Sequence, residues 1–304
     1  MVSHHVGDEA AFYPGDASQP GCRISAGRLA ADGPRAVEKR YCDLGGEIYY
    51  DSPVEKILVE NGSAVGVRLK DGREDRAGTV ISGADGYATI FKMLDGQFLN
   101  DTVREPYQSG EIFPPILLIG LGIDQEMSEP YGLTCELSVA LEEPFTIGTD
   151  TINRLEFLIY NFDPSLAPPG KTVVTVMINA SYTYWKELHG EPERYESEKQ
   201  RVALEVIKRL DQRFPGIAEK VEMADVATPV TFEHYTGSWQ GSFEGWMPTP
   251  AAVMKSMAKT LPGLENFYMV GQWVQPGGGL PSGVMTARQV IQMLCKRDRK
   301  KFHS

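Results

Sequence analysis

The segment Phe267–Gly283 constrains the fold of this chain more than any other part of the sequence. Phe267–Trp273 is typical of a short buried strand, Val274–Gly283 is rich in glycine, and the apolar period that continues to Cys295 indicates a helix. Three consecutive glycines let a backbone lie close against a flat ligand, because no Cβ stands in the way. We expect the helix to begin near Gly283, with its first N–H groups unpaired and its positive dipole end facing the loop. Such a loop suits a ligand that develops negative charge.

This segment also resembles a known motif. Gly271-Gln272-Trp273, followed by Pro276-Gly277-Gly278-Gly279-Leu280-Pro281-Ser282-Gly283, resembles the C-terminal flavin-contacting motif of the phytoene desaturase-like FAD-dependent oxidoreductases. That group includes carotenoid desaturases, carotenoid isomerases and retinol saturases. The resemblance implies FAD as the cofactor, and reduced flavin does gather negative charge around its N1 and C2 oxygen. The FAD-binding residues that it implies are Val54, Gly271, Gln272, Trp273, Pro276, Gly277, Gly278, Gly279, Leu280, Pro281, Ser282, Gly283 and Val284.

A second region carries the same resemblance. Gly45–Ile48, then Val54 and Ile57, then Val80–Asp85 resemble the middle part of the FAD domain of that family. In the family, the valine that matches Val54 contacts the adenine end of FAD through its backbone. An ordinary strand residue is the other interpretation of Val54, and both stay open at this point.

The phosphate-binding turn of such folds is absent from this sequence. FAD-binding folds of this kind begin with a strand, a Gly-x-Gly-x-x-Gly turn and a helix whose N-terminus holds the pyrophosphate. Gly21, Gly27 and Gly33 have the wrong spacing, and no β-branched strand precedes them. The resemblance therefore covers residues 34–304, as in the C-terminal part of a longer enzyme. We expect the isolated chain to bind FAD poorly and to leave a sheet edge exposed.

Patterns along the chain give the other elements. Helix 34–44 is expected to begin at Pro34 and to end at Gly45-Gly46. Strand 47–50 precedes a three-stranded antiparallel meander that turns at Asn61-Gly62 and Asp71-Gly72, and strand 79–85 returns to a sheet. Farther along, strands are expected at 114–123, 155–160 and 171–178, and a long amphipathic helix from Tyr195 to Phe214.

Together these patterns predict an α/β fold with α+β character: an incomplete FAD-binding Rossmann-like domain with an inserted mixed-sheet substrate domain. The expected division is an irregular segment at 1–33, the middle part of the FAD domain at 34–89, the substrate domain at 90–260, and the last strand, loop and helix of the FAD domain at 261–304.

The chemistry that the resemblance implies resides in the cofactor, because a flavin accepts a hydride at N5 and the protein binds and orients the substrate. The sequence shows no Ser-His-Asp or Cys-His set, and no catalytic residue is assigned. Aromatic residues just after Thr228-Pro229 are candidates for an apolar substrate channel, with plain core packing as the alternative for each one. They are Phe232, Tyr235, Trp239, Phe243 and Trp246. Glu233 and His234 are a candidate proton-transfer pair, although a solvated loop is favoured, and Glu219, Glu222 and Asp225 are expected to be exposed charge.

The leading functional hypothesis is an FAD-dependent oxidoreductase that acts on a polyisoprenoid, carotenoid or retinoid-like substrate, in a truncated form. One alternative is an amine-oxidase-type flavoenzyme, for which Trp273 supplies one member of an aromatic pair at the flavin face and no second member is evident. The other alternative is a non-catalytic fragment without flavin that binds an apolar ligand or a partner chain, such as a missing N-terminal half. The direction of the reaction, the substrate and the electron acceptor stay open.

Composition excludes several other classes. A formal net charge of −11 gives no basic field for nucleic acid. The basic tail Lys296–Lys301 is expected to be a solvated helix end, with contact to an anionic membrane as the less favoured alternative. Four scattered cysteines and five scattered histidines give neither a disulfide framework nor a metal site, so none is expected. The sequence therefore favours a cytoplasmic protein, with peripheral membrane contact as an option for a lipophilic substrate.

Overall fold

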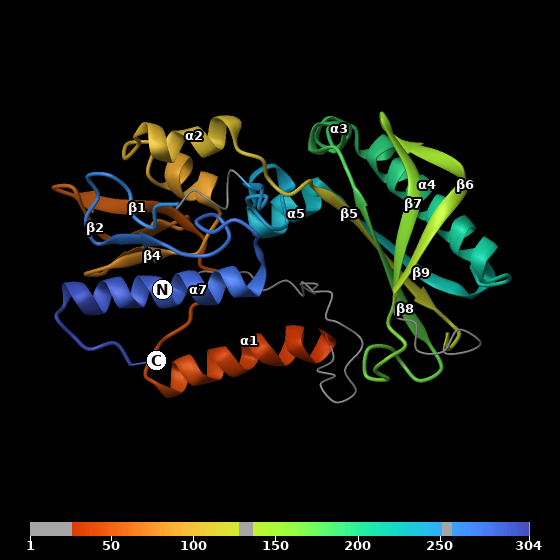
Figure 1. Cartoon of the computed structure of the whole chain (residues 1–304), viewed down its shortest axis with the longest axis horizontal. Helices are drawn as coiled ribbons and strands as arrows, with labels where there is room; N and C mark the ends of the chain where they lie inside the picture. Colours follow the sequence, from red (N-terminus) through yellow and green to blue (C-terminus); the bar gives the residue numbers. More distant parts are fainter. Residues whose placement is uncertain (1–25, 128–135, 251–256, 304) are drawn as a thin grey trace.

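The computed structural model describes residues 26–127, 136–250 and 257–303, with the side chains of its first helix described from Gly33 onward. Within these residues the chain forms two lobes, each around its own hydrophobic core (Figure 1). One core is built from the strands and helices between Leu117 and Val230. The other core joins segments far apart in the sequence, since Ile57 and Val80 pack in it together with Phe267 and Met269.

The helices, in chain order, are α1 (Ala26–Asp43), η1 (Ala88–Met93, a π-helix), α2 (Asp101–Ser109), α3 (Tyr182–Leu188), α4 (Pro192–Arg213), η2 (Ala218–Lys220), α5 (Pro229–Thr236), η3 (Trp239–Gly241) and α7 (Gly279–Arg297). The strands are β1 (Val54–Glu60), β2 (Ser63–Leu69), β3 (Glu74–Arg76), β4 (Val80–Ser82), β5 (Ile116–Ile123), β6 (Glu136–Ile147), β7 (Asp150–Ile159), β8 (Thr172–Asn179), β9 (Val221–Ala227) and β10 (Phe267–Met269).

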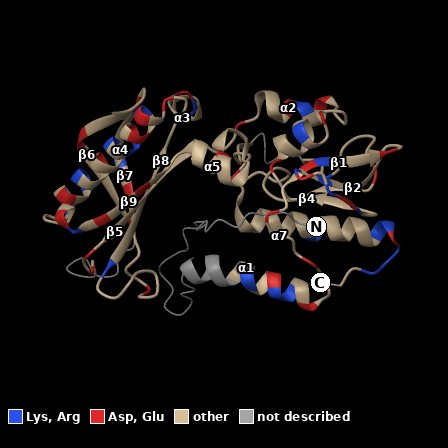
Figure 2. Ribbon diagram, turned by 180° about the vertical axis from the view of Figure 1, so that it is seen from behind, with Lys and Arg blue, Asp and Glu red and all other residues tan. Residues whose placement is uncertain are grey.

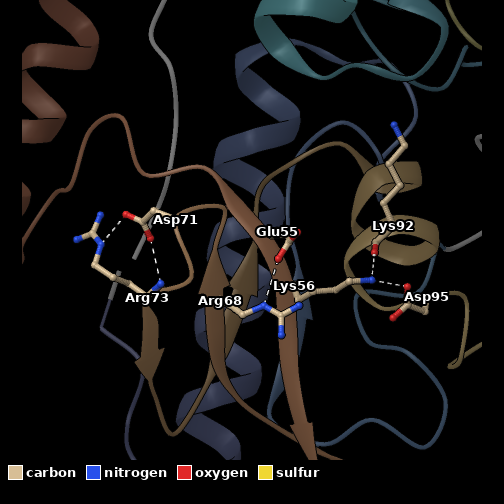
Figure 3. Close-up of polar contacts among 7 residues, drawn as sticks. All are labelled: Glu55, Lys56, Arg68, Asp71, Arg73, Lys92 and Asp95. Carbon is tan, nitrogen blue, oxygen red and sulfur yellow. Dashed lines mark hydrogen bonds and ion pairs between the residues drawn. The ribbon is translucent and has the colours of Figure 1, made fainter.

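The first lobe holds two small sheets. β1, β2 and β3 form the expected antiparallel meander, and the hairpin between β1 and β2 turns at Asn61 and Gly62, whose φ angles are 49° and 77°. Positive φ at both positions is the backbone twist that a two-residue hairpin turn needs. Ion pairs lie on the surface of this meander (Figure 3). Glu55 pairs with Arg68 across the hairpin, and Lys56 pairs with Asp95, which follows η1 in the sequence.

The second small sheet connects distant parts of the sequence. β10 runs parallel to β4, with Phe267 opposite Val80 and Met269 opposite Ser82. The described residues give this sheet two strands, and the Ile81 side chain on β4 is 36% exposed. An open edge of a parallel sheet was expected, because the sequence lacks the first strand and phosphate turn of the family fold.

The second lobe is one five-stranded sheet in the order β6-β7-β8-β5-β9, with helices against one face (Figure 1). β8 shows why the sheet has one covered face: Val174, Val176 and Ile178 are buried, whereas Met177 between them is 42% exposed. From α4, Val202, Val206 and Leu210 lie in the same core, which confirms the amphipathic helix predicted around Tyr195–Phe214.

Two expectations about the N-terminal part are wrong. The first helix begins at Ala26 and carries Pro34 inside it: Arg28–Ala31 are good helix formers, although Gly27 and Gly33 on either side of them are poor ones. Residues 47–50 form no strand, because no described strand pairs with them, and the side chains of Tyr49 and Tyr50 are exposed. The expected domain boundaries stay a prediction.

The last helix also begins earlier than expected. α7 starts at Gly279, with Gly278 as its N-cap residue, rather than near Gly283. Pro281 in the first turn does not delay the start, since the first N–H groups of a helix have no intrahelical partner anyway. No described helix combines the length and the apolar character that crossing a bilayer would require.

Candidate functional site

The glycine loop adopts a conformation that only glycine takes without strain. Gly277, Gly278 and Gly279 have φ angles of 102°, 57° and 70°. At Gly278 a Cβ would lie 2.6 Å from Glu244 Cβ and 2.7 Å from the Glu244 carbonyl oxygen. The loop is therefore packed against the segment around Glu244, and the close backbone approach at Gly278 is to another part of the protein.

Hydrogen bonds fasten the loop on both sides. The Gly277 N–H donates to the Trp246 carbonyl oxygen at 3.0 Å, and the Trp246 indole N–H donates to the Trp273 carbonyl oxygen at 3.0 Å. At the start of the loop, the Gly271 N–H donates to the buried Thr286 hydroxyl at 2.8 Å, which itself donates to the Ser282 carbonyl oxygen at 2.6 Å. The loop is thus tied both to α7 and to the segment that arrives from the second lobe.

Within the described part of the chain, no side chain caps the N-terminus of α7. Its N-cap residue, Gly278, makes no side-chain hydrogen bond, and the first turn contains no acidic residue. At Gly271 and at Gly283 a Cβ would meet nothing within 4 Å. Open space beside an uncapped helix N-terminus fits a ligand that carries negative charge, as the sequence predicted, although the helix start has moved to Gly279.

The other predicted FAD-binding residues differ in their solvent exposure. Trp273, Gly278 and Ser282 are buried, and Leu280, Pro281 and Val284 on α7 are exposed. Partly exposed are Gly271, Gln272, Pro276, Gly277, Gly279 and Gly283. Val54 opens β1 in the meander, where it pairs with Leu69 and is half-buried, so its contact with a cofactor stays a prediction.

Next to the loop, aromatic rings from four segments pack together. Trp273 lies edge-on to Trp246 with ring centroids 5.3 Å apart, and nearly parallel to Tyr107 at 6.5 Å. Trp239 contacts Trp246 and Trp273 at 6.2 Å, and stacks on Tyr87 at 5.2 Å with an interplanar angle of 2°. We call these six rings the aromatic cluster: Tyr87, Phe91, Tyr107, Trp239, Trp246 and Trp273.

Two of the five predicted substrate residues, Trp239 and Trp246, belong to the aromatic cluster. Phe243 instead packs on Phe113, with ring centroids 5.6 Å apart. Phe232 is half-buried on α5, and Tyr235 is 58% exposed on the same helix. The sequence analysis missed Tyr87, Phe91 and Tyr107, because they lie far from the glycine loop in the sequence and only the fold brings them to it.

The Glu233–His234 pair does not form. Both residues lie on α5 rather than in a loop, and the Glu233 carboxylate accepts hydrogen bonds from Tyr182 at 2.9 Å and from Lys186 at 2.6 Å. Desolvation by burial is the largest single influence on the pKa of Glu233 and raises it. The two hydrogen bonds, together with the charges of Lys186 and Lys92, outweigh it and hold this pKa below its ordinary value. His234 is exposed and lies edge-on to Tyr235. Glu219, Glu222 and Asp225 are exposed, as expected.

Asp85 is the buried titratable group nearest the aromatic cluster. It lies three residues after the end of β4, is 6% exposed, and its carboxylate accepts the N–H groups of Ala88 at 2.7 Å and Trp239 at 2.8 Å. Desolvation raises its pKa to about 6, although the hydrogen bonds and Lys92 oppose this shift. Burial also raises the pKa of Tyr107. A buried carboxyl with a perturbed pKa, near the end of a parallel strand, makes Asp85 a candidate for the functional site.

A cavity of about 570 Å³ lies on the sheet of the second lobe. It is lined by β7 and the end of β8, beside Pro114, and includes Asn153, Arg154 and Glu156. This polar lining does not match an apolar substrate. The described residues hold no metal-ligating cluster, and Cys42 and Cys295 are free thiols, while Cys22 and Cys135 lie outside the described residues.

Comparison with known proteins agrees with this geometry. The family model described as flavin containing amine oxidoreductase matches residues 15–291, a match that begins before the expected residue 34. The prolycopene isomerase of Arabidopsis thaliana is 34% identical over 82% of this chain and 42% of its own length. A 4,4'-diapophytoene desaturase of Methylomonas sp is 25% identical over 90% of this chain and 53% of its own. The chain therefore spans about half the length of the curated relatives it matches.

Solved structures share the fold. An oxidoreductase from Methanosarcina mazei has a TM-score of 0.51 at 21% identity, covering 85% of this chain and 53% of its own. A variant of putrescine oxidase has a TM-score of 0.53 at 13% identity, covering 88% and 57%. These neighbours share the α/β fold of this chain. The sheet of the inserted second lobe is antiparallel throughout the described residues, so the expected mixed sheet is wrong.

Proposed function

The chain belongs to the flavin containing amine oxidoreductase family, and we propose that it forms the flavin-ring and substrate part of an FAD-dependent oxidoreductase that acts on a polyisoprenoid or carotenoid. The observation that carries this proposal is the uncapped N-terminus of α7 beside the three left-handed glycines, with open space at Gly271 and Gly283. Sequence relatives named as carotenoid isomerase and desaturase support the substrate class.

In this proposal the loop Gly277–Gly279 and the first turn of α7 hold the pyrimidine end of the flavin ring, where main-chain N–H groups and the helix dipole meet developing negative charge. When bound, the flavin supplies the hydride chemistry. The chain contributes the aromatic cluster, which presents a rigid apolar wall beside the loop and excludes water from it. No acid or base of the chain is assigned a proton-transfer role.

The pyrophosphate of FAD needs a cradle that this sequence does not contain. We propose that polypeptide outside this sequence supplies it and adds strands to the β10-β4 sheet, to which the described residues contribute two strands. α7 supports this, since Leu280, Val284 and Met285 on it are at least half exposed. Its charged residues are Arg288, Lys296 and Arg297, so most of the helix is uncharged (Figure 2). Relatives about twice as long as the matched part agree with this arrangement.

Amine oxidation is the second candidate, and one observation favours it. From the sequence, Trp273 was one member of an aromatic pair at the flavin face, with no second member evident. In the structure the Tyr107 ring lies nearly parallel to Trp273, at an interplanar angle of 16°. A turnover assay of the chain joined to a dinucleotide-binding segment, with a polyene against a diamine, separates the two candidates. Polyene conversion supports the carotenoid proposal, and amine turnover alone contradicts it.

A location follows from the substrate class. We propose a cytoplasmic protein that contacts a membrane peripherally, because a polyene resides in lipid. The basic end of α7, from Lys296 to Lys301, is the segment suited to anionic headgroups. Sedimentation with anionic vesicles at low and high salt tests it: binding that salt removes is expected, and no binding at low salt contradicts it.

A further inference from the structure

Asp85 joins the two lobes at the aromatic cluster. Its two carboxylate oxygens accept from different segments: Oδ1 accepts the Ala88 N–H at 2.7 Å, and Oδ2 accepts the Trp239 N–H at 2.8 Å. Ala88 begins η1 in the first lobe, whereas Trp239 follows α5, whose Val230 lies in the core of the second lobe. One side chain therefore holds a main-chain group from each side of the junction.

The segment that Asp85 holds is strained. Gln240, next to Trp239, has a φ of 56°, a left-handed conformation that a residue with a side chain adopts only when its surroundings impose it. At Gly241, with a φ of 66°, a Cβ would lie 2.3 Å from the Pro229 carbonyl oxygen. A turn of this kind needs an anchor, and the Asp85 carboxylate provides it at the Trp239 N–H.

Burying the Asp85 carboxylate costs free energy, so a gain in folding stability does not explain why an ionised group stands at this position. Asp85 is 6% exposed, and a buried carboxylate without a bonded cation is expensive. The charged or titratable groups that act on it are Lys92 on η1 and Tyr107 on α2, and the segments around Tyr87 and Trp239 present main-chain N–H groups. A buried ionised group kept against this cost is typical of functional sites.

We propose that Asp85 is a positioning residue: its ionised carboxylate holds Trp239 in the aromatic cluster, and protonation of that carboxylate loosens Trp239 from the wall. Protonation leaves both bonded N–H groups facing a neutral acid, whose oxygens are weaker acceptors than those of a carboxylate. Trp239 stacks on Tyr87 and contacts Trp246 and Trp273, so its release changes the whole wall. The proposal rests on the proposed function only in placing this wall beside the flavin.

Tryptophan fluorescence emission reports on the packing of the aromatic cluster directly, and the measurement needs no cofactor. Three of the four tryptophans, Trp239, Trp246 and Trp273, lie in the aromatic cluster, and Trp185 is buried in the other core. We expect the emission of the wild-type chain to change as the pH falls from 8 to 5, with a midpoint near the pKa of about 6 for Asp85. Far-UV circular dichroism at each pH establishes that the chain stays folded.

Single-residue variants show which groups cause the pH-dependent change in emission. Asp85→Asn abolishes it, because an amide cannot titrate, and Trp239→Phe removes most of its amplitude. Asp95→Asn is the matched control: Asp95 pairs with Lys56 on the surface of the same lobe (Figure 3), and its φ of 54° suits asparagine, so the midpoint stays unchanged. His234→Gln, five residues before Trp239, excludes a histidine titration and likewise leaves the midpoint unchanged.

Two results overturn the proposal: a change in Asp85→Asn equal to that of wild type, or no change in wild type between pH 8 and 5. If Asp85→Asn does not fold, the ¹⁵N–¹H signals of Trp239 and Ala88 in the wild type decide instead. They titrate together with one midpoint near 6 if Asp85 holds both, and static signals contradict the proposal. Flavin binding is measured separately, so a failure of the proposed function leaves this result intact.

Discussion

The Trp246 indole N–H donates to the main-chain carbonyl oxygen of Trp273 at 3.0 Å, and this bond connects the segment after α5 to the start of the glycine loop. Both indoles are buried, with exposures of 3% and 4%. The Gly277 N–H returns a bond to the Trp246 carbonyl oxygen at 3.0 Å. One residue of the aromatic cluster therefore fixes both ends of the segment between Trp273 and Gly277.

Replacing Trp246 with Phe tests this connection. The Trp273 carbonyl oxygen loses its donor in a buried place, so the free energy of unfolding falls by about 1–3 kcal/mol. Urea denaturation measures the change, with Tyr235→Phe as the control, since Tyr235 is 58% exposed and its loss of a hydroxyl changes stability by less than about 0.5 kcal/mol. Equal stability of Trp246→Phe and wild type contradicts the connection.

Thr286→Val tests the other fastening of the loop. The variant keeps the shape of the side chain but loses the acceptor for the Gly271 N–H, which costs about 1–3 kcal/mol. Amide hydrogen exchange at Gly271 is expected to accelerate in Thr286→Val and to stay slow in Thr286→Ser, which keeps the hydroxyl. Unchanged exchange in the valine variant shows that the hydroxyl does not hold the loop.

Gly278→Ala is expected to destabilise the chain. Its φ of 57° and ψ of −163° lie in a region that is essentially confined to glycine, and a conformation of this kind costs about 1–3 kcal/mol for a residue with a side chain. The contact with Glu244 adds to this cost. Thermal unfolding measures the loss, and an unchanged midpoint contradicts the described loop geometry.

Gly283→Ala separates stability from flavin binding. Gly283 lies inside α7 and a Cβ there meets nothing within 4 Å, so alanine raises the free energy of unfolding by about 0.5–1 kcal/mol through helix propensity. If the flavin ring occupies that open space, the added methyl group weakens flavin binding although the fold is more stable. A variant that binds flavin as tightly as wild type places the ring elsewhere.

The pH dependence of stability follows from Asp85. Its folded pKa of about 6 lies above its ordinary value of 3.8, so the folded state binds the proton more tightly than the unfolded chain does. Its stabilising contribution is complete below pH 3.8 and is lost as the pH rises through 6, by about 3 kcal/mol in total. Denaturation at pH 5 and pH 8 is expected to show about half of this loss, roughly 1.4 kcal/mol, in wild type and in Asp95→Asn, but not in Asp85→Asn. The same loss in Asp85→Asn contradicts the assignment.

How far the sequence predicts the fold depends on how local the signal is. The hairpin at Asn61-Gly62, the amphipathic helix α4 and the strand–loop–helix order after Phe267 depend on neighbouring residues, and each was predicted. β6 and β9 were missed. The many exposed residues of β9 hide an alternation, and only pairing with β5 makes it a strand. β6 was missed although Leu137, Val139 and Leu141 alternate with exposed residues.

The candidate site divides in the same way. The glycine loop could be found in the sequence, since three adjacent glycines are a local pattern. Tyr107 and Asp85 could not be assigned a place in the site, because they reach it only through folding: Asp85 bonds Trp239, which is far away in the sequence, and Tyr107 arrives on α2. The resemblance of Val80–Asp85 to the middle part of the FAD domain is the signal that pointed to Asp85.

Fluorescence titration of this chain with riboflavin and with FAD tests the central claim most directly. Riboflavin lacks the diphosphate, and this sequence offers only the ring end of the site. We therefore predict that both ligands bind with a dissociation constant above about 1 μM, that FAD binds at most threefold tighter than riboflavin, and that Gly283→Ala weakens both. Sub-micromolar binding of FAD, or no binding of either ligand at millimolar concentration, would contradict the account.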